Sequence, residues 1–121
     1  MSSQTVLIVD DDPAIVELVE MALDDRGYRV LSAVDGVAVA MAHDQRPDVI
    51  LLDINMPVMD GAEVSQRLRA DPLTAAIPII VMSAHERLQA TTGRLQVDDR
   101  LPKPFTLAAL YATVARWMPP A

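Results

Sequence analysis

The residues of greatest chemical interest in this sequence each follow a short apolar run. They are Asp10, Asp11, Asp53, Ser83 and Lys103. Apolar runs without alternation are typical of strands that are covered on both faces of a parallel sheet. The carboxyl ends of such strands share one edge, which is where α/β proteins collect their ligands. We therefore expect these side chains to meet at one edge of a sheet.

This group of side chains has the parts needed to move a phosphoryl group. Converging carboxylates repel one another unless protons or a hard cation neutralise them, and oxygen ligands with open water positions favour Mg²⁺. A metal ion, a nucleophilic carboxylate, a hydroxyl and a lysine together indicate phosphoryl transfer to a carboxylate. Asp53 is the expected acceptor, since a carboxylate directly after a buried run is costly in an ordinary structural role unless it is paired.

Taken one at a time, most of these residues also have a structural interpretation. Asp10, Asp11 and Asp12 precede a helix, where they fit an N-cap and favourable charges near the helix N-terminus. Ser83 alone fits a helix cap, and Lys103, between two prolines, fits a surface loop. Their joint placement at one sheet edge is what favours the functional interpretation.

Length and composition indicate one globular domain over residues 1–121. The chain has 121 residues, of which 51% are hydrophobic, enough to bury a full core. Because there is no cysteine, a disulfide framework and a thiolate metal site are both excluded. A net charge of −7 disfavours direct binding to nucleic acid. With no basic and apolar leader and no apolar run of membrane length, we expect a cytoplasmic protein without membrane contact.

Strand-like and helix-like segments alternate along the chain, which is typical of βα units on a parallel sheet. Strands are expected at Val6–Val9, Arg29–Ala33, Val49–Asp53, Pro78–Met82 and Arg100–Leu101. Helices are expected from Pro13 to Gly27, from Val37 to Gln45, from Gly61 to Ala70, from Ser83 to Gly93 and from Leu107 to Met118. Asp12 and Thr106 are the expected N-caps of the first and last helices. In the third helix, Arg67 and Arg69 are expected on the outer face. Right-handed crossovers between these units predict a doubly wound sheet.

Four motifs resemble those of the response-regulator receiver domain of bacterial two-component signalling, of the chemotaxis-regulator type. They are Val9-Asp10-Asp11-Asp12, Leu52 to Gly61, Met82-Ser83-Ala84 and Leu101 to Phe105. The resemblance covers essentially the whole chain. It implies an α/β, flavodoxin-like doubly wound (βα)5 fold, with a five-stranded parallel sheet in the order 2-1-3-4-5.

The resemblance also implies roles for individual residues. Asp53 would be phosphorylated by a histidine kinase or a histidine phosphotransfer protein, and Ser83 and Lys103 would each bind a phosphoryl oxygen. The implied Mg²⁺ ligands are Asp10, Asp11, Asp53 and the backbone carbonyl of Asn55. The chain would then be a phosphoacceptor that assists its own phosphorylation and dephosphorylation, not an enzyme, and it would signal to a downstream protein target.

Other classes of function fit the sequence less well. A haloacid-dehalogenase-like phosphohydrolase would need a second aspartate two positions after Asp53, where Asn55 stands. A flavin-binding flavodoxin would need a phosphate loop rich in Ser, Thr and Gly after the first strand, where the chain has three acids. A receiver-fold docking module that works without phosphorylation remains the main alternative.

The chain departs from the receiver pattern close to Lys103. Arg100 stands where many receivers have Tyr or Phe, Gln96 stands where Gly is common, and the segment from Ser83 to Lys103 is short. A guanidinium stays charged and is costly to bury. We therefore expect Arg100 to remain at the surface rather than to turn inward.

Overall fold

The computed structural model describes residues 4–53, 61–84 and 97–119. Within these ranges each of the first three strands is followed by a helix. In order, they are β1 (Thr5–Val9), α1 (Pro13–Asp24), β2 (Arg29–Ala33), α2 (Asp35–Gln45), β3 (Val49–Asp53), α3 (Gly61–Ala70), β4 (Ile79–Ala84), β5 (Asp99–Lys103) and α5 (Leu107–Trp117). No helix in the described ranges combines the length and apolar character that crossing a lipid bilayer requires.

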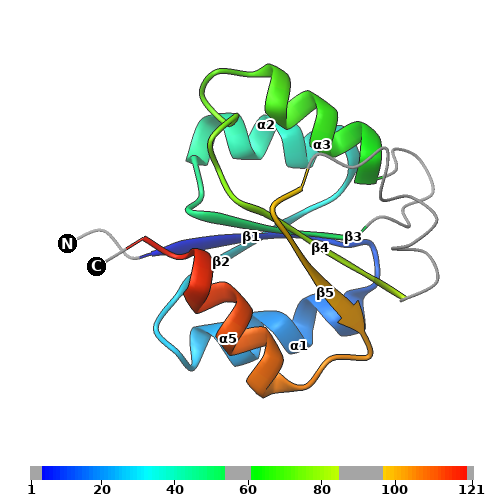
Figure 1. Ribbon diagram of the computed structural model, residues 1–121, viewed down its shortest axis with the longest axis vertical. Coiled ribbons are helices and arrows are strands. Elements are labelled where there is room, and N and C mark those ends of the chain that lie inside the picture. The colour runs from blue at the N-terminus through cyan, green and yellow to red at the C-terminus, as the bar shows by residue number, and fades with distance from the viewer. Residues whose placement is uncertain (1–3, 54–60, 85–96, 120–121) are drawn as a thin grey trace.

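The strands form one parallel sheet in the order β2-β1-β3-β4-β5, as the resemblance implied. Helices α2 and α3 cover one face of the sheet, and α1 and α5 cover the other (Figure 1). β1 and β3 are buried along their whole length, which explains their apolar sequences. β1, β2, β3 and β4 contribute residues to a core cluster on each face of the sheet, whereas β5 contributes only Leu101, to one of them.

The predicted N-caps of α1 and α5 are confirmed. The Asp12 carboxylate accepts a hydrogen bond from the Ala14 amide at 2.9 Å, and Pro13 occupies the first turn. The Thr106 hydroxyl accepts one from the Ala109 amide at 3.0 Å. Both caps satisfy amides that would otherwise lack an intrahelical partner.

Several predicted boundaries were wrong. α1 ends at Asp24, and Gly27 lies in the following turn with φ +86°, a value that favours glycine. α2 begins at Asp35, two residues before the predicted start at Val37, and the acid at this position suits the positive end of the helix. β5 continues through Pro102 to Lys103, because an edge strand tolerates a residue without an amide hydrogen.

The start of the predicted helix from Ser83 to Gly93 was also wrong. Ser83 and Ala84 continue β4, and Ser83 pairs with Pro102 of β5. β4 therefore ends two residues later than predicted, at Ala84 rather than Met82. The rest of this predicted helix, with Gln96 after it, lies outside the described residues.

Arg69 does not point outward as predicted, whereas Arg67 is exposed. The Arg69 side chain is only 19% exposed. It donates hydrogen bonds to the carbonyl oxygens of Ala75 and Ile77 at 2.7 and 2.9 Å and to the Asp98 carboxylate at 2.5 Å. The segment between α3 and β4 passes close to Arg69 near the end of α3. Its backbone carbonyls need hydrogen-bond donors, which Arg69 provides. Arg69 thus fastens α3 to the starts of β4 and β5.

Asp99 ties β5 to α5. Its Oδ2 accepts hydrogen bonds from the Trp117 indole and the Arg116 guanidinium, both at 2.8 Å, and its Oδ1 accepts one from the Arg100 amide at 2.8 Å. Burial alone raises the pKa of Asp99, but the bond from Trp117 and the other two donors outweigh burial and lower that pKa below its usual value. The ionised carboxylate therefore stabilises the fold above its unfolded-state pKa.

We expect Trp117→Phe to lower the free energy of unfolding at pH 7 by about 1–2 kcal/mol, because it removes a donor from a charged acceptor. The stabilisation by ionised Asp99 is lost as pH falls through the lowered native pKa, so the two proteins should converge once the pH is below that pKa. Urea unfolding across this pH range measures the effect. In an Asp99→Asn background the pH-dependent part should vanish; its persistence would show that another group is responsible.

Candidate functional site

The fold brings the predicted residues to one edge of the sheet. Asp10 follows β1, Asp53 ends β3, Ser83 lies near the end of β4 and Lys103 ends β5. The register places these ends level, since Val9 pairs with Leu52, Asp53 with Met82 and Ser83 with Pro102. This edge lies at the right of the view in Figure 1, opposite the start of β1 and the end of α5.

Three carboxylates form a cluster at this edge. One oxygen each from Asp10, Asp11 and Asp53 lies within 4.8 Å of the others. Asp10 and Asp53 are only 3% and 4% exposed, whereas Asp11 is open to solvent. Burying two carboxylates this close together is costly unless a cation compensates them.

Lys103 supplies part of that compensation. Its Nζ lies 3.2 Å from Asp10 Oδ2 and 3.7 Å from Asp53 Oδ1. Asp10 Oδ1 accepts a hydrogen bond from the Asp12 amide at 2.9 Å, so both oxygens of Asp10 have a partner. Three carboxylates and one ammonium leave a formal excess of two negative charges. The site as described therefore has a net attraction for a divalent cation.

Ser83 is 1% exposed, and its hydroxyl has no hydrogen-bond partner among the described residues. A buried hydroxyl without a partner is rare and calls for an explanation such as an absent ligand. Asn55, the fourth predicted metal ligand, lies outside the described residues. Arg100 is exposed on β5, as predicted.

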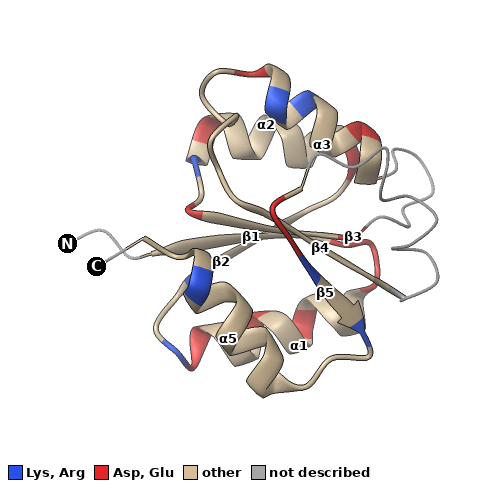
Figure 2. Ribbon diagram, viewed as in Figure 1, with Lys and Arg blue, Asp and Glu red and all other residues tan. Residues whose placement is uncertain are grey.

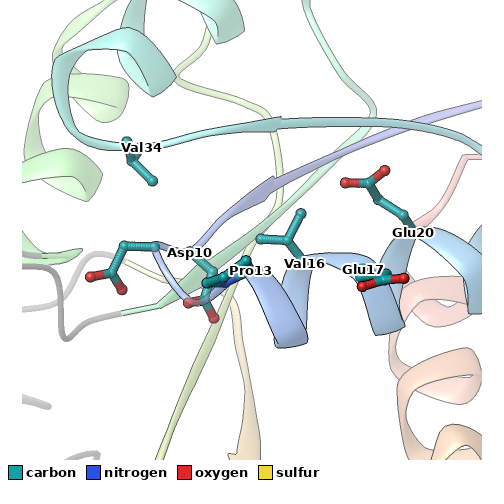
Figure 3. Close-up of a pocket in the computed structure, with 7 residues that line it drawn as sticks. Asp10, Pro13, Val16, Glu17, Glu20 and Val34 are labelled. Carbon is teal, nitrogen blue, oxygen red and sulfur yellow. The ribbon is translucent and has the colours of Figure 1, made fainter.

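A hollow of about 560 Å³ opens beside the carboxylates, between α1 and the end of β2. It is lined by Asp10, Asp11, Pro13, Val16, Glu17, Glu20 and Val34. Figure 3 shows Glu17 and Glu20 following Pro13 and Val16 along α1, away from Asp10. Sequence analysis missed these two glutamates. Their i, i+3 spacing just after the acidic run was the available signal, because it places both on one side of the helix.

A family model described as "Response regulator receiver domain" matches residues 6–115. Curated relatives include the DNA-binding dual master transcriptional regulator RpaA of Synechocystis, which is 43% identical over 112 residues, 90% of this chain and 46% of that protein. The transcriptional regulatory protein PrrA of Mycobacterium tuberculosis is 43% identical over 117 residues, 94% of this chain and 49% of that protein. The chain thus spans about half the length of these relatives.

Solved structures match over nearly their full length. The chemotaxis protein CheY4 of Vibrio cholerae is 35% identical with a TM-score of 0.85, covering 97% of this chain and 100% of that one. The receiver domain of the sensor histidine kinase PA1611 of Pseudomonas aeruginosa is 36% identical with a TM-score of 0.87, covering 96% and 98%. That structure holds a magnesium ion coordinated in its active-site cleft.

Proposed function

Because this chain belongs to the response-regulator receiver domain family, we propose that it accepts a phosphoryl group on Asp53 from a histidine kinase or histidine phosphotransfer protein. The observation that carries the proposal is the buried Asp53 carboxylate, within 3.7 Å of Lys103 and clustered with two further acids. The phosphorylated chain then signals to a downstream protein through a changed binding face. A structural ion pair would account for Lys103 but not for the two further carboxylates beside Asp53.

In the proposed reaction, a carboxylate oxygen of Asp53 attacks the phosphorus of a phosphohistidine. The new phosphorus–oxygen bond forms as the phosphorus–nitrogen bond breaks, and the electron pair of the broken bond stays on the imidazole nitrogen. Lys103 balances charge on the phosphoryl oxygens from its position beside Asp53. Ser83 donates its hydroxyl, which has no hydrogen-bond partner among the described residues, to another of these oxygens.

The donor set fits Mg²⁺. Carboxylate oxygens are the ligands that this hard cation prefers, and the excess of two negative charges in the cluster equals its charge. Asp10, Asp11 and Asp53 would hold the ion together with the carbonyl of Asn55. When bound, it supplies positive charge against the oxygens of the group being transferred.

We expect Mg²⁺ to raise the melting temperature of the chain, because it binds the native site and not the unfolded state. At about ten times its dissociation constant the gain in unfolding free energy is about 1.4 kcal/mol, which for a domain of this size is a shift of a few degrees. Differential scanning calorimetry with and without Mg²⁺ measures it. A melting curve indifferent to Mg²⁺ would contradict the proposed metal site.

The proposed function is tested by incubating the chain with acetyl phosphate and Mg²⁺ and measuring its intact mass. We expect one added phosphoryl group, located on Asp53 by peptide mapping. A receiver-fold docking module that works without phosphorylation predicts no uptake under any condition. Affinity capture with the phosphorylated and unphosphorylated chain then tests the downstream partner, which should be retained differently by the two forms.

A further inference from the structure

β2 is an edge strand, because β1 is its single neighbour in the sheet of the described residues. The Arg29 amide donates a hydrogen bond to the Gln4 carbonyl oxygen at 2.9 Å, so the backbone of Arg29 faces β1. Backbone groups face the two sides of a strand alternately, and the N–H and C=O groups of Val30 and Ser32 therefore face outward. β2 pairs with β1 without a bulge and contains no proline. It thus lacks two of the devices by which edge strands avoid further pairing.

Two hollows flank this free edge, one on each face of the sheet. The hollow on the face covered by α1 has a volume of about 250 Å³ and is lined by Glu20, Met21, Asp24 and Val30. The hollow on the face covered by α2 has a volume of about 330 Å³, and its lining includes Arg29, Leu31, Val37, Met41 and Asp44. Side chains of a strand point alternately to its two faces. A strand added beside β2 would therefore place alternate side chains over the two hollows.

The two hollows differ in chemistry. On the α1 face, Glu20 and Asp24 are acidic, and none of the described residues that line the hollow is basic. Figure 2 shows acidic positions along α1. On the α2 face, Arg29 and Asp44 carry opposite charges, and Val37 in the same lining is 62% exposed. The edge is therefore complementary to a strand with basic side chains on one face and apolar side chains on the other.

Charge disfavours a second copy of this chain as the occupant. Antiparallel pairing of two β2 strands about a two-fold axis would place α1 of both copies on the same face of the sheet. Glu20 and Asp24 of one copy would then approach the same acids of the other, and each chain has a net charge of −7.

We propose that the β2 edge binds an extended segment of a partner protein in which basic and apolar residues alternate. The segment adds a strand to the sheet through hydrogen bonds to the backbone of Val30 and Ser32. Its basic side chains lie over Glu20 and Asp24, and its apolar side chains lie over the α2 hollow. Asp53 does not line either hollow, so this binding does not depend on its phosphorylation.

The test measures the binding of synthetic peptides to the full chain by isothermal titration calorimetry at low salt. Each peptide has about six residues, the usual length of a strand. Lysine and valine alternate in the first peptide, the same residues are grouped in the second, and glutamate replaces lysine in the third. The second and third should bind about tenfold more weakly than the first, since one does not match both hollows and the other has the wrong charge. Equal affinities of the first two would show attraction by net charge alone and overturn the proposal.

Backbone pairing is tested by methylating the amide nitrogens of the lysines in one alternating peptide and of the valines in another. Amides of alternate residues face the same side of a strand, so one peptide loses the donors that face β2 and the other keeps them. We expect one to bind normally and the other about tenfold more weakly. Equal affinities of the two methylated peptides would contradict pairing with β2.

On the protein, Ser32→Pro removes an outward amide hydrogen and should weaken binding of the alternating peptide about tenfold. Proline is tolerated on an edge strand where the missing N–H faces solvent. Ser32→Thr, which keeps the amide, is the matched control and should bind normally. Melting curves show whether both variants are folded, and normal binding by folded Ser32→Pro would overturn the proposal.

Glu20→Gln/Asp24→Asn should weaken binding of the lysine peptide about two- to fivefold at low salt, but not near 1 M salt, where the Debye length is about 3 Å. The control Asp25→Asn/Glu63→Gln removes two charges that line neither hollow and should have no such effect. Equal losses in both double variants would sink the assignment of the basic face. A dimer of the unmodified chain in sedimentation, dissociated by Ser32→Pro, would assign the edge to a second copy instead.

Discussion

The Asp53→Asn variant should take up no phosphoryl group from acetyl phosphate at a Mg²⁺ concentration that fully labels the unmodified chain. An amide is not a nucleophile towards phosphorus, and the only other acids of the cluster are Asp10, which is held at both oxygens, and Asp11, which is exposed. The substitution is nearly isosteric and removes one of the mutually repelling charges. The variant should therefore fold at least as stably as the unmodified chain in the absence of metal.

Asp12→Asn is the matched control, because it makes the same chemical change beside the site. The Asp12 side chain caps α1, and asparagine caps helices as well as aspartate does. The bond to Asp10 comes from the backbone amide of this residue and is kept. This control should be labelled normally. Stoichiometric Mg²⁺-dependent labelling of Asp53→Asn itself would place the acceptor elsewhere.

The fold could be predicted from local patterns because the sheet is buried on both faces. Buried parallel strands appear as continuous apolar runs, and the ends of β2, β3 and α3 were predicted to the residue. The strand order is a different matter, since the hydrophobic pattern of each strand does not specify its neighbour. Only the resemblance to the receiver family supplied that order.

The residues at the site could be predicted from the sequence, but the contacts between them could not. Sequence position places Lys103 at the sheet edge, but its closer approach to Asp10 than to Asp53 depends on side-chain packing across three strands. Arg69 was predicted wrongly for the same reason, since its acceptors include carbonyls of a connecting segment that has no periodic pattern. Charged side chains that bond the backbone of another segment leave no signature in hydrophobic periodicity.

The pairing of Lys103 with two buried acids leads to a large expected effect on stability. Lys103→Met keeps the length of the side chain but removes its charge, which leaves Asp10 with one backbone donor and no cation among the described residues. The Asp10 side chain has no exposed surface, whereas that of Lys103 is 25% exposed. Removing one partner of a buried pair typically costs about 3–5 kcal/mol. Because Lys103 is partly hydrated, we expect a loss of about 2–4 kcal/mol in the metal-free protein.

A double-mutant cycle with Asp10→Asn isolates the interaction. In that background the charge at Asp10 is already absent, so Lys103→Met should cost much less than in the unmodified chain. The surface control is Arg67→Met, which breaks the 3.3 Å pair with Glu63, both side chains of which are about half exposed. Such a pair is worth about 0.5 kcal/mol or less.

Addition of Mg²⁺ gives an independent readout on the same variants. Without Lys103 the cluster holds three negative charges and no ammonium, so Mg²⁺ should raise the unfolding free energy of Lys103→Met more than that of the unmodified chain. Urea unfolding with and without the metal measures both effects. A cost no greater than that of Arg67→Met, or the same cost in the Asp10→Asn background, would show that the Lys103 charge does not hold the carboxylates together.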